Sequence, residues 1–142
     1  MIPTRLLDTN ILLRFIMFDD PDQSTRTAEL FQQLADEAFE GLISMTVILE
    51  TVFVLERTGY KDNREWIADS ILIVAGAKGV RFIDNEQRYL PGTLSLYREH
   101  RQLSFADCYH AELALTHCSG EIYTFDKEFR RVPGIVRLEP GI

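Results

Sequence analysis

The chain alternates short apolar runs with longer stretches in which apolar residues recur every three or four positions. The short runs predict strands at residues 4–8, 42–44, 80–84, 121–124 and 135–138. The longer stretches predict helices at residues 9–18, 22–40, 46–58, 64–77, 85–100 and 104–117, and a single helical turn at 127–131. Because strands alternate with helices, the pattern predicts an α/β fold with a mainly parallel sheet.

Glycine and proline set the expected ends of several helices. The long helix at 22–40 is predicted to end at Gly41, and the helix at 64–77 at Gly79. The helix at 85–100 is predicted to be interrupted at Pro91-Gly92, because proline lacks the amide hydrogen that a helix interior needs. No repeat or long linker divides the 142 residues, so we expect one domain spanning 1–142.

Composition limits the class of protein. The hydrophobic fraction is 46%, enough for a core, while the net charge is −7. This charge argues against a protein that holds nucleic acid by bulk positive charge, although a local basic rim remains compatible with it. Cys108 and Cys118 form no paired motif and are expected to be reduced packing residues. With no signal-peptide pattern and no membrane-length apolar run, we expect a cytoplasmic protein without membrane contact.

Four acidic residues lie where folding alone gives them little reason to be. Asp8 and Asp126 end the first and fourth predicted strands, Asp107 lies in the first turn of a helix, and Glu50 interrupts an apolar helix. In open parallel sheets, ligands bind beyond the carboxyl ends of the strands, which places Asp8 and Asp126 at one rim. The helix dipole favours a carboxylate at the position of Asp107.

Each acid also has a local explanation. Asp8 and Asp126 are suited to cap the helices that follow them, and Ser104 with Asp107 resembles a capping box. Glu50 has the weakest such explanation, because its neighbours on the helix face are mostly apolar. A buried, unpartnered carboxylate is costly, so Glu50 needs a salt bridge to a residue such as Arg57, a cleft wall, or a metal.

One shared cause explains the four acids better than four separate ones. Carboxylates brought together repel one another unless cations bind between them, so we predict a divalent-metal site. Ligands that are all oxygen favour Mg²⁺ or Mn²⁺ over zinc. The three histidines show no zinc-ligand spacing, and His110, three residues after Asp107, is expected to have a surface role or a supporting role behind the ligands.

The motifs LLDTN, ILETVFVLERTGY, SFADCYHAELAL and TFDKEFRRVPGI, in this order, resemble the PIN-domain nucleases, and in particular the VapC toxins of type II toxin–antitoxin systems. The resemblance covers essentially the whole chain. It implies a parallel sheet of about five strands flanked by helices on both faces. It also implies a metal-dependent endoribonuclease, a homodimer, and an antitoxin whose tail blocks the acidic pocket with a basic side chain.

Carried over to this chain, the resemblance implies that Asp8, Glu50, Asp107 and Asp126 form the catalytic and metal-binding quartet. Asp8 and Asp107 would be the direct Mg²⁺ ligands, with Mn²⁺ as a substitute, and Asp126 would act through water. Two positions correspond to small polar residues that orient carboxylates or water, namely Asn10 and Thr124. Glu128 is a further acid at the rim.

Basic residues near the predicted site are candidates for contacts with RNA phosphates. Lys127, Arg130 and Arg131 follow Asp126 directly, and Arg14 and Arg57 qualify if their helix faces open on the cleft. The alternative for each is a solvated surface charge.

Two other functions fit part of the sequence. The first is a catalytically silent PIN-like module that binds RNA or protein, and the intact quartet argues against it. The second is a receiver-like signalling domain, which expects paired acids after the first strand, whereas here a single Asp8 is followed by Thr9-Asn10.

Overall fold

A sheet of five parallel strands lies at the centre of the structure, a computed structural model that describes residues 1–60 and 62–142. The strand order is β3-β2-β1-β4-β5, so β1 is central and β5 is an edge strand. The strands span β1 Thr4–Leu7, β2 Glu40–Ile43, β3 Val80–Phe82, β4 Glu121–Tyr123 and β5 Val136–Leu138. Along the chain, β1, β2 and β3 form one half of the sheet, and β4 and β5 are then added on the other side of β1. The direction in which strands are added therefore reverses between β1 and β4.

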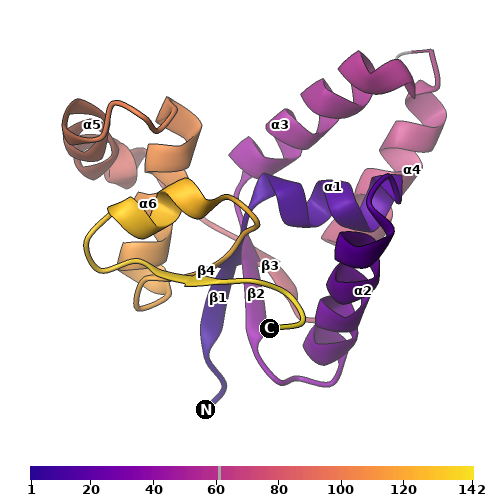
Figure 1. The fold of residues 1–142 in the computed structure, drawn as a ribbon, viewed down its shortest axis with the longest axis horizontal. Helices are drawn as coiled ribbons and strands as arrows, with labels where there is room; N and C mark the ends of the chain where they lie inside the picture. The colour runs from indigo at the N-terminus through magenta and orange to yellow at the C-terminus, as the bar shows by residue number, and fades with distance from the viewer. Residues whose placement is uncertain (61) are drawn as a thin grey trace.

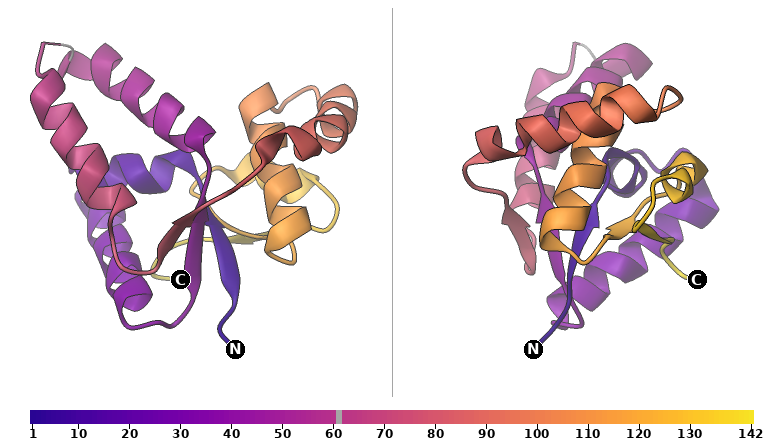
Figure 2. Two further views of the ribbon diagram at one scale, coloured as in Figure 1. Left: turned by 180° about the vertical axis from the view of Figure 1, so that it is seen from behind. Right: turned by 90° about the vertical axis from the view of Figure 1, so that its left-hand side faces the viewer.

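Helices cover both faces of the sheet (Figures 1 and 2). The helices are α1 Thr9–Met17, α2 Pro21–Ala35, α3 Met45–Leu55, α4 Arg64–Ala75, α5 Leu90–Glu99 and α6 Phe105–His117, with short helical turns η1 Glu56–Tyr60, η2 Glu86–Tyr89 and η3 Lys127–Arg131. Helices α1 to α4 lie on one side and α5 and α6 on the other, which confirms the predicted α/β arrangement. In the described part of the chain, no helix has both the length and the apolar character needed to cross a membrane.

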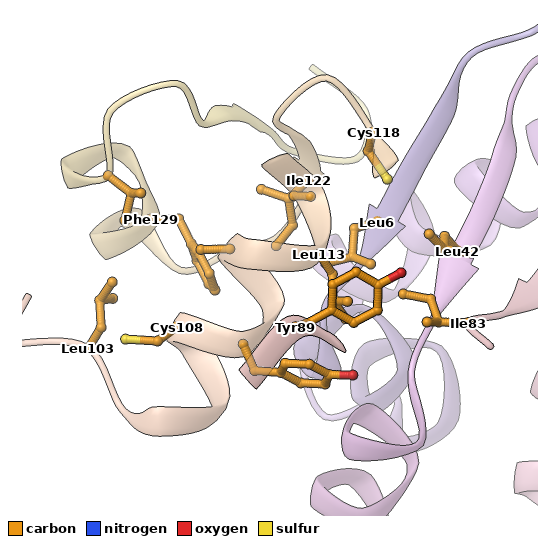
Figure 3. Close-up of a cluster of buried hydrophobic side chains, with 14 residues drawn as sticks. Leu6, Leu42, Ile83, Tyr89, Leu103, Cys108, Leu113, Cys118, Ile122 and Phe129 are labelled. Atoms are coloured by element: carbon orange, nitrogen blue, oxygen red, sulfur yellow. The ribbon is translucent and has the colours of Figure 1, made fainter. Parts of the chain in front are cut away.

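Two apolar cores flank the sheet because successive side chains of a strand point to opposite faces. Leu6 of β1 packs with residues of α6, β2 and β4, including Leu42, Leu113 and Ile122, as Figure 3 shows. Leu7, the next residue, packs on the other face with the cluster that includes Ile11 and Leu34. Both leucines are fully buried. The central strand is therefore fixed from both sides, which holds the residue that follows it in one position.

The predicted helix at 22–40 is too long at its carboxyl end. Helix α2 ends at Ala35, Glu37 takes a left-handed conformation with φ of 61°, and β2 begins at Glu40. The apolar spacing continues past Ala35, but Glu40 pairs in register with Thr4 of β1, and this pairing requires an extended chain. Tertiary pairing therefore overrides the local helical pattern, and Gly41 lies inside the strand rather than at a helix end.

The predicted interruption at Pro91-Gly92 is also wrong. Helix α5 begins at Leu90 and runs through both residues to Glu99, with Pro91 in its first turn, where no intrahelical partner is needed for its missing amide hydrogen. Gly92 is instead a packing position, because an added Cβ would lie 1.6 Å from a carboxylate oxygen of Glu112 on α6. The break in regular helix lies earlier, where η2 passes into α5.

Gly79 is expected to tolerate alanine far worse than Gly59, although both have positive φ, at 91° and 105°. A Cβ at Gly79 would lie 2.7 Å from the backbone oxygen of Leu34, whereas a Cβ at Gly59 would meet nothing within 4 Å. We expect Gly59→Ala to cost about 1 kcal/mol for backbone strain alone. We expect Gly79→Ala to cost roughly 3 kcal/mol, since steric overlap adds to that strain. Urea unfolding of both variants would test this, and equal losses would contradict the packing explanation.

Candidate metal centre

Asp8 lies at the carboxyl end of the central strand and begins helix α1. Its side chain is almost fully buried, and its backbone amide donates to the carbonyl of Tyr123 on β4, with an N–O distance of 3.1 Å. Asp8 Oδ1 accepts the Thr9 amide at 2.8 Å, which is the helix cap that the sequence suggested. Asp8 Oδ2 accepts the Thr124 hydroxyl at 2.7 Å. The carboxylate is thus fixed at the point where the strand order reverses, the usual ligand position in such sheets.

Asp107 reaches the same place from the amino end of α6. Ser104 caps this helix, and its hydroxyl oxygen accepts the Asp107 amide at 3.1 Å, while Asp107 Oδ2 accepts the Ser104 amide at 3.4 Å. The capping box is therefore present. It leaves Asp107 Oδ1 outside the cap, so this side chain is able to cap its helix and also contribute to a site.

His110 lies one helical turn after Asp107 and joins two of the predicted acids. Its Nδ1 is 3.1 Å from Asp8 Oδ1, and its Nε2 is 3.8 Å from Glu50 Oε1. The side chain is completely buried, so the surface role considered for it is wrong. Among the described residues, neither ring nitrogen has a well-directed hydrogen bond, which makes the contact with Asp8 one of charge and proximity. A buried imidazole aimed at two carboxylates suits either a metal ligand or a counter-charge.

The donor atoms of three residues come close enough to share one cation. One atom from each of Asp8, Asp107 and His110 lies within 4.8 Å of the others. Two carboxylate oxygens suit Mg²⁺ or Mn²⁺, and the unpaired imidazole nitrogens favour Mn²⁺ among these two ions. The residues present therefore fit a divalent cation.

The pKa values show that this group of acids is electrostatically strained. Burial raises the pKa of Asp107 above its usual range, and the nearby charge of Asp8 raises it further. Burial also acts to raise the pKa of Asp8, but His110 and the hydrogen bonds from Thr124 and Thr9 outweigh burial, so this pKa is lowered. Burial acts to lower the pKa of His110, yet Asp8 and the other acids raise it. One acid with a raised pKa is what crowded carboxylates are expected to show.

Glu50 stands on helix α3, at the edge of this cluster. The Thr9 hydroxyl donates to Glu50 Oε1 at 2.7 Å, and the Glu50 side chain remains 35% exposed. The salt bridge to Arg57 that the sequence allowed is not the partner found, because the Arg57 guanidinium lies over the ring of Phe53, 4.4 Å from its centroid. Glu50 is therefore a wall residue of an open site, which resolves how an acid is accommodated in an apolar helix.

The Asp126 carboxylate is turned toward its own helical turn. Asp126 Oδ1 accepts the amide of Glu128 at 2.9 Å and caps η3. The Asp126 amide donates to Thr124 Oγ1 at 3.0 Å, and this hydroxyl in turn donates to Asp8. In the part of the chain that the structure describes, Asp126 is thus connected to the cluster through Thr124 rather than joined to it directly.

Asn10 and Thr124 form the polar support beneath Asp8. Asn10 Nδ2 donates to Thr124 Oγ1 at 3.1 Å and lies 3.4 Å from Asp8 Oδ2, while Asn10 Oδ1 accepts the Phe125 amide at 3.2 Å. These contacts tie the start of α1 to the end of β4. Residues that orient a ligand in this way commonly change metal affinity when they are replaced.

Thr124→Val is expected to weaken metal binding by about tenfold, because valine keeps the shape but removes the hydroxyl that donates to Asp8. The variant also leaves the Asp126 amide without its acceptor, which we expect to cost about 1–3 kcal/mol of stability. Titration calorimetry with Mn²⁺ and urea unfolding would measure the two effects. Thr124→Ser restores the hydroxyl and is expected to restore both; a serine variant as impaired as the valine one would contradict this role.

The basic residues after Asp126 differ in their surroundings. Lys127, Arg130 and Arg131 are all exposed, but Arg131 Nε pairs with Glu128 Oε2 at 2.7 Å. Glu128 is therefore engaged by this arginine. Arg14 is held by Asp19, with Nη1 and Oδ1 2.8 Å apart, at the junction of α1 and α2. Lys127 and Arg130 remain as exposed cations beside the site.

Two contributors to the site had only weak signals in the sequence. Thr9, within the motif LLDTN, orients Glu50, and the sequence indicated only that it begins a helix. Arg137 donates from Nε to the carbonyl of Asp126 at 2.9 Å and so fixes the loop after β4, although it lies on the edge strand β5. The spacing of His110 from Asp107 was the one visible hint that a third side chain faces the cluster.

Acidic side chains thus gather at the carboxyl edge of a parallel sheet, at the point where the strand order reverses, and could hold a divalent cation. A family model matches residues 5–135 of the chain, and it is the model of the PIN domain. The chain therefore belongs to the PIN domain family, which confirms the resemblance found in the sequence. In the comparison with curated protein sequences, no match was found.

Solved structures with the same fold include bacterial toxins. The chain is similar to VapC20 of Mycobacterium tuberculosis, described as a toxin that cleaves the sarcin–ricin loop, with a TM-score of 0.72, 16% identity, and coverage of 94% of this chain and 98% of that one. VapBC2 of Rickettsia felis, solved with a promoter DNA fragment, has a TM-score of 0.67 and 19% identity, with coverage of 96% of this chain and 98% of that one. A toxin–antitoxin complex from Klebsiella pneumoniae has a TM-score of 0.58 and 23% identity, with coverage of 93% of this chain and 95% of that one. At these identities the likeness shows a shared fold.

Proposed function

We propose that this PIN domain is a Mg²⁺-dependent endoribonuclease that acts as the toxin of a toxin–antitoxin pair. The observation that carries the proposal is the convergence of Asp8, Asp107 and His110, whose donor atoms lie within 4.8 Å of one another at the carboxyl edge of the sheet. The toxins with the same fold, one of them described as cleaving an RNA loop, support the choice of RNA as the substrate.

In this proposal Asp8 and Asp107 hold the cation directly, and Glu50 and Asp126 complete the acidic quartet from the rim. When bound there, the cation would supply two things: a lowered pKa for a water that attacks the scissile phosphate, and positive charge for the phosphate oxygens. Mn²⁺ is expected to replace Mg²⁺, since the same carboxylate oxygens suit both ions. Asn10 and Thr124 keep Asp8 oriented, which limits the reorganisation needed when the cation enters.

Glu50 is the residue placed to handle a proton. Its Oε1 accepts the Thr9 hydroxyl, which leaves Oε2 to orient a water molecule and to accept a proton from it. The partly exposed position on α3 allows solvent and substrate to reach this carboxylate. Asp126 would act through water, because its Oδ1 is engaged in capping η3.

Substrate binding would use a local basic rim, since the whole chain carries a net charge of −7. Lys127 and Arg130 are exposed beside Asp126 and would contact RNA phosphates, with Arg131 joining them if it leaves Glu128. So small a number of cations gives weak nonspecific affinity, which suits an enzyme that selects a particular RNA by shape.

The proposed partners are an antitoxin and a second copy of the chain. Helix α3 exposes Met45, Leu49 and Phe53, large apolar side chains that a homodimer interface would cover. The antitoxin would insert a basic side chain among the carboxylates and so neutralise them. The toxin–antitoxin complexes with the same fold support this partner class. We place the pair in the cytoplasm, where RNA is the substrate.

The test is cleavage of total bacterial RNA by the purified, antitoxin-free chain with Mg²⁺, with Mn²⁺, and with EDTA. Discrete cuts that need metal are expected. A folded chain that binds Mg²⁺ in calorimetry but cuts no RNA would favour the catalytically silent binding module. Phosphorylation of the chain by a small phosphodonor would favour the receiver-like alternative, because a nuclease forms no phosphoprotein.

A further inference from the structure

A cavity lies beside the candidate metal centre, between helices α3, α5 and α6. Its volume is about 290 Å³, and its lining residues come from four elements: Thr46, Glu86, Leu90, Thr93, Phe105 and Tyr109. The residues come from both sides of the gap between α3 and α6, the two helices that carry Glu50 and Asp107. The cavity is thus part of the same face of the molecule as the acids.

The cavity is a neighbour of the metal centre. The centroid of the Tyr109 ring lies 6.3 Å from that of the His110 ring, and Phe105 lies four residues before Tyr109, on the same face of α6. Thr46 lies one helical turn before Glu50 on α3. A polymer whose phosphate reached the carboxylates would therefore place a neighbouring nucleotide at this cavity.

The lining combines apolar rings with one acidic group. Phe105 and Leu90 are 45% and 48% exposed, so both offer apolar surface at the opening. The Tyr109 hydroxyl donates to Glu86 Oε2, which fixes the Glu86 carboxylate within the lining. Burial, and then the Glu86 charge, raise the pKa of the Tyr109 hydroxyl, so it stays a donor at neutral pH. In the described part of the chain, no hydrogen bond is found to Glu86 Oε1.

We propose that this cavity binds a nucleobase of the RNA substrate next to the scissile phosphate, and that it selects guanine. Aromatic and apolar walls favour a planar base, since stacking on a side chain is worth about 1–3 kcal/mol for each base. Guanine presents two adjacent donors, N1–H and the N2 amino group, toward a carboxylate acceptor. This inference rests on the proposed ribonuclease function, because the acids supply the reason for RNA to be there.

Two features of the cavity indicate its occupant: the carboxylate of Glu86 in its lining and the acidic centre beside it. A carboxylate at the cavity favours a ligand with hydrogen-bond donors and disfavours one that presents acceptors alone. An apolar side chain from a second copy would leave Glu86 Oε1 without a donor, which makes it a poorer match. A second copy in the cavity is an outcome that the experiment below distinguishes.

The test uses the full chain in EDTA, titrated with 5′-GMP, 5′-IMP, 5′-AMP, 5′-CMP and 5′-UMP and followed by NMR chemical shifts. GMP is expected to bind most tightly and to shift resonances of the lining residues. IMP, which lacks the N2 amino group, is expected to bind about tenfold more weakly, the effect of one hydrogen bond to a charged acceptor. Working without metal separates base binding from cleavage, so the failure of either idea is visible independently.

Three variants make the test specific. Glu86→Gln keeps an acceptor for Tyr109 but turns an amide group to the base, and it is expected to reduce the GMP affinity about tenfold. Phe105→Ala is expected to weaken all bases by a similar factor. Phe18→Ala removes an exposed ring at the end of α1 and serves as the matched control, with no change expected.

Several outcomes would overturn the proposal. These are no binding of any nucleotide, equal binding of all five, or a GMP affinity that both Glu86→Gln and Phe105→Ala leave unchanged. Sedimentation velocity adds a further one: if Phe105→Ala converts a dimer into a monomer with the same GMP affinity, the cavity is a subunit contact.

Discussion

Asp8→Asn is expected to reduce Mg²⁺-dependent RNA cleavage about a thousandfold while the chain stays folded. Asparagine retains one oxygen, which can accept the Thr9 amide as Asp8 Oδ1 does, so the cap of α1 survives. Its amide group takes the place of Oδ2 and faces the Thr124 hydroxyl oxygen, which can accept a hydrogen bond from it. What disappears is the negative charge at the centre of the donor cluster, and with it most of the attraction for a divalent cation. Gel analysis of the cut RNA measures the activity, and calorimetry with Mg²⁺ measures the binding.

Asp20→Asn is the matched control for this experiment. Asp20 caps α2 as Asp8 caps α1, and its Oδ1 accepts the Gln23 amide at 3.1 Å. Both substitutions exchange a capping carboxylate for an amide, but Asp20 is not one of the clustered donors found among the described residues. Activity that falls equally in the two variants, or in neither, would show that the cluster around Asp8 is not the catalytic centre.

His110→Ala is expected to destabilise the metal-free protein by about 3 kcal/mol. The imidazole is completely buried, and its Nδ1 is 3.1 Å from Asp8 Oδ1, so its removal leaves a buried carboxylate without its counter-charge. Mg²⁺ is expected to return part of this loss, since the cation supplies positive charge to the same acids. We expect Mg²⁺ to stabilise the variant about 1 kcal/mol more than it stabilises the unmodified chain. Urea unfolding in EDTA and in Mg²⁺ measures both.

Cys108→Ala separates the loss of charge from the loss of packing. Cys108 is also fully buried on α6, but its neighbours are apolar residues such as Leu103. We expect Cys108→Ala to lower the free energy of unfolding by about 1 kcal/mol, by the same amount in EDTA and in Mg²⁺. If the deficit of His110→Ala were likewise independent of Mg²⁺, the imidazole would be a packing residue rather than the counter-charge of the acids.

The fold was largely readable from the sequence because its elements are short and strongly patterned. Apolar runs that end in Asp8 and Asp126 marked the strands β1 and β4, and Ser104 marked the start of α6. Of the two elements that were misjudged, α2 is the one whose end is set by long-range pairing, whereas α5 was wrongly expected to be interrupted at Pro91-Gly92. Nothing local stops the helix at Ala35; the register of Glu40 with Thr4 does.

The site was predictable in its members more than in its geometry. The capping roles and the site roles were weighed as alternatives, whereas in the structure Asp8 and Asp107 cap their helices and also lie in the candidate donor cluster. Both are possible because a carboxylate has two oxygens and several lone pairs. The burial of His110 was not visible, since an amphipathic pattern shows which face a residue takes but not what covers that face. The Asp126 side chain points toward the Glu128 amide because of the geometry of the loop after β4, which the spacing of residues in the sequence does not predict.

The central position of β1 also determines when the centre can exist. Asp8 emerges early from the ribosome, but the hydroxyl that orients it belongs to Thr124, which lies 116 positions later. At synthesis rates of about 5–20 residues per second, the two ends of this contact are made roughly ten seconds apart. Until then β1 has no β4 beside it, and neither Asp107 nor His110 is in place. Under the proposed ribonuclease function, a nascent chain is therefore expected to be inactive toward the RNA around it until Thr124 has been made and β4 has paired with β1.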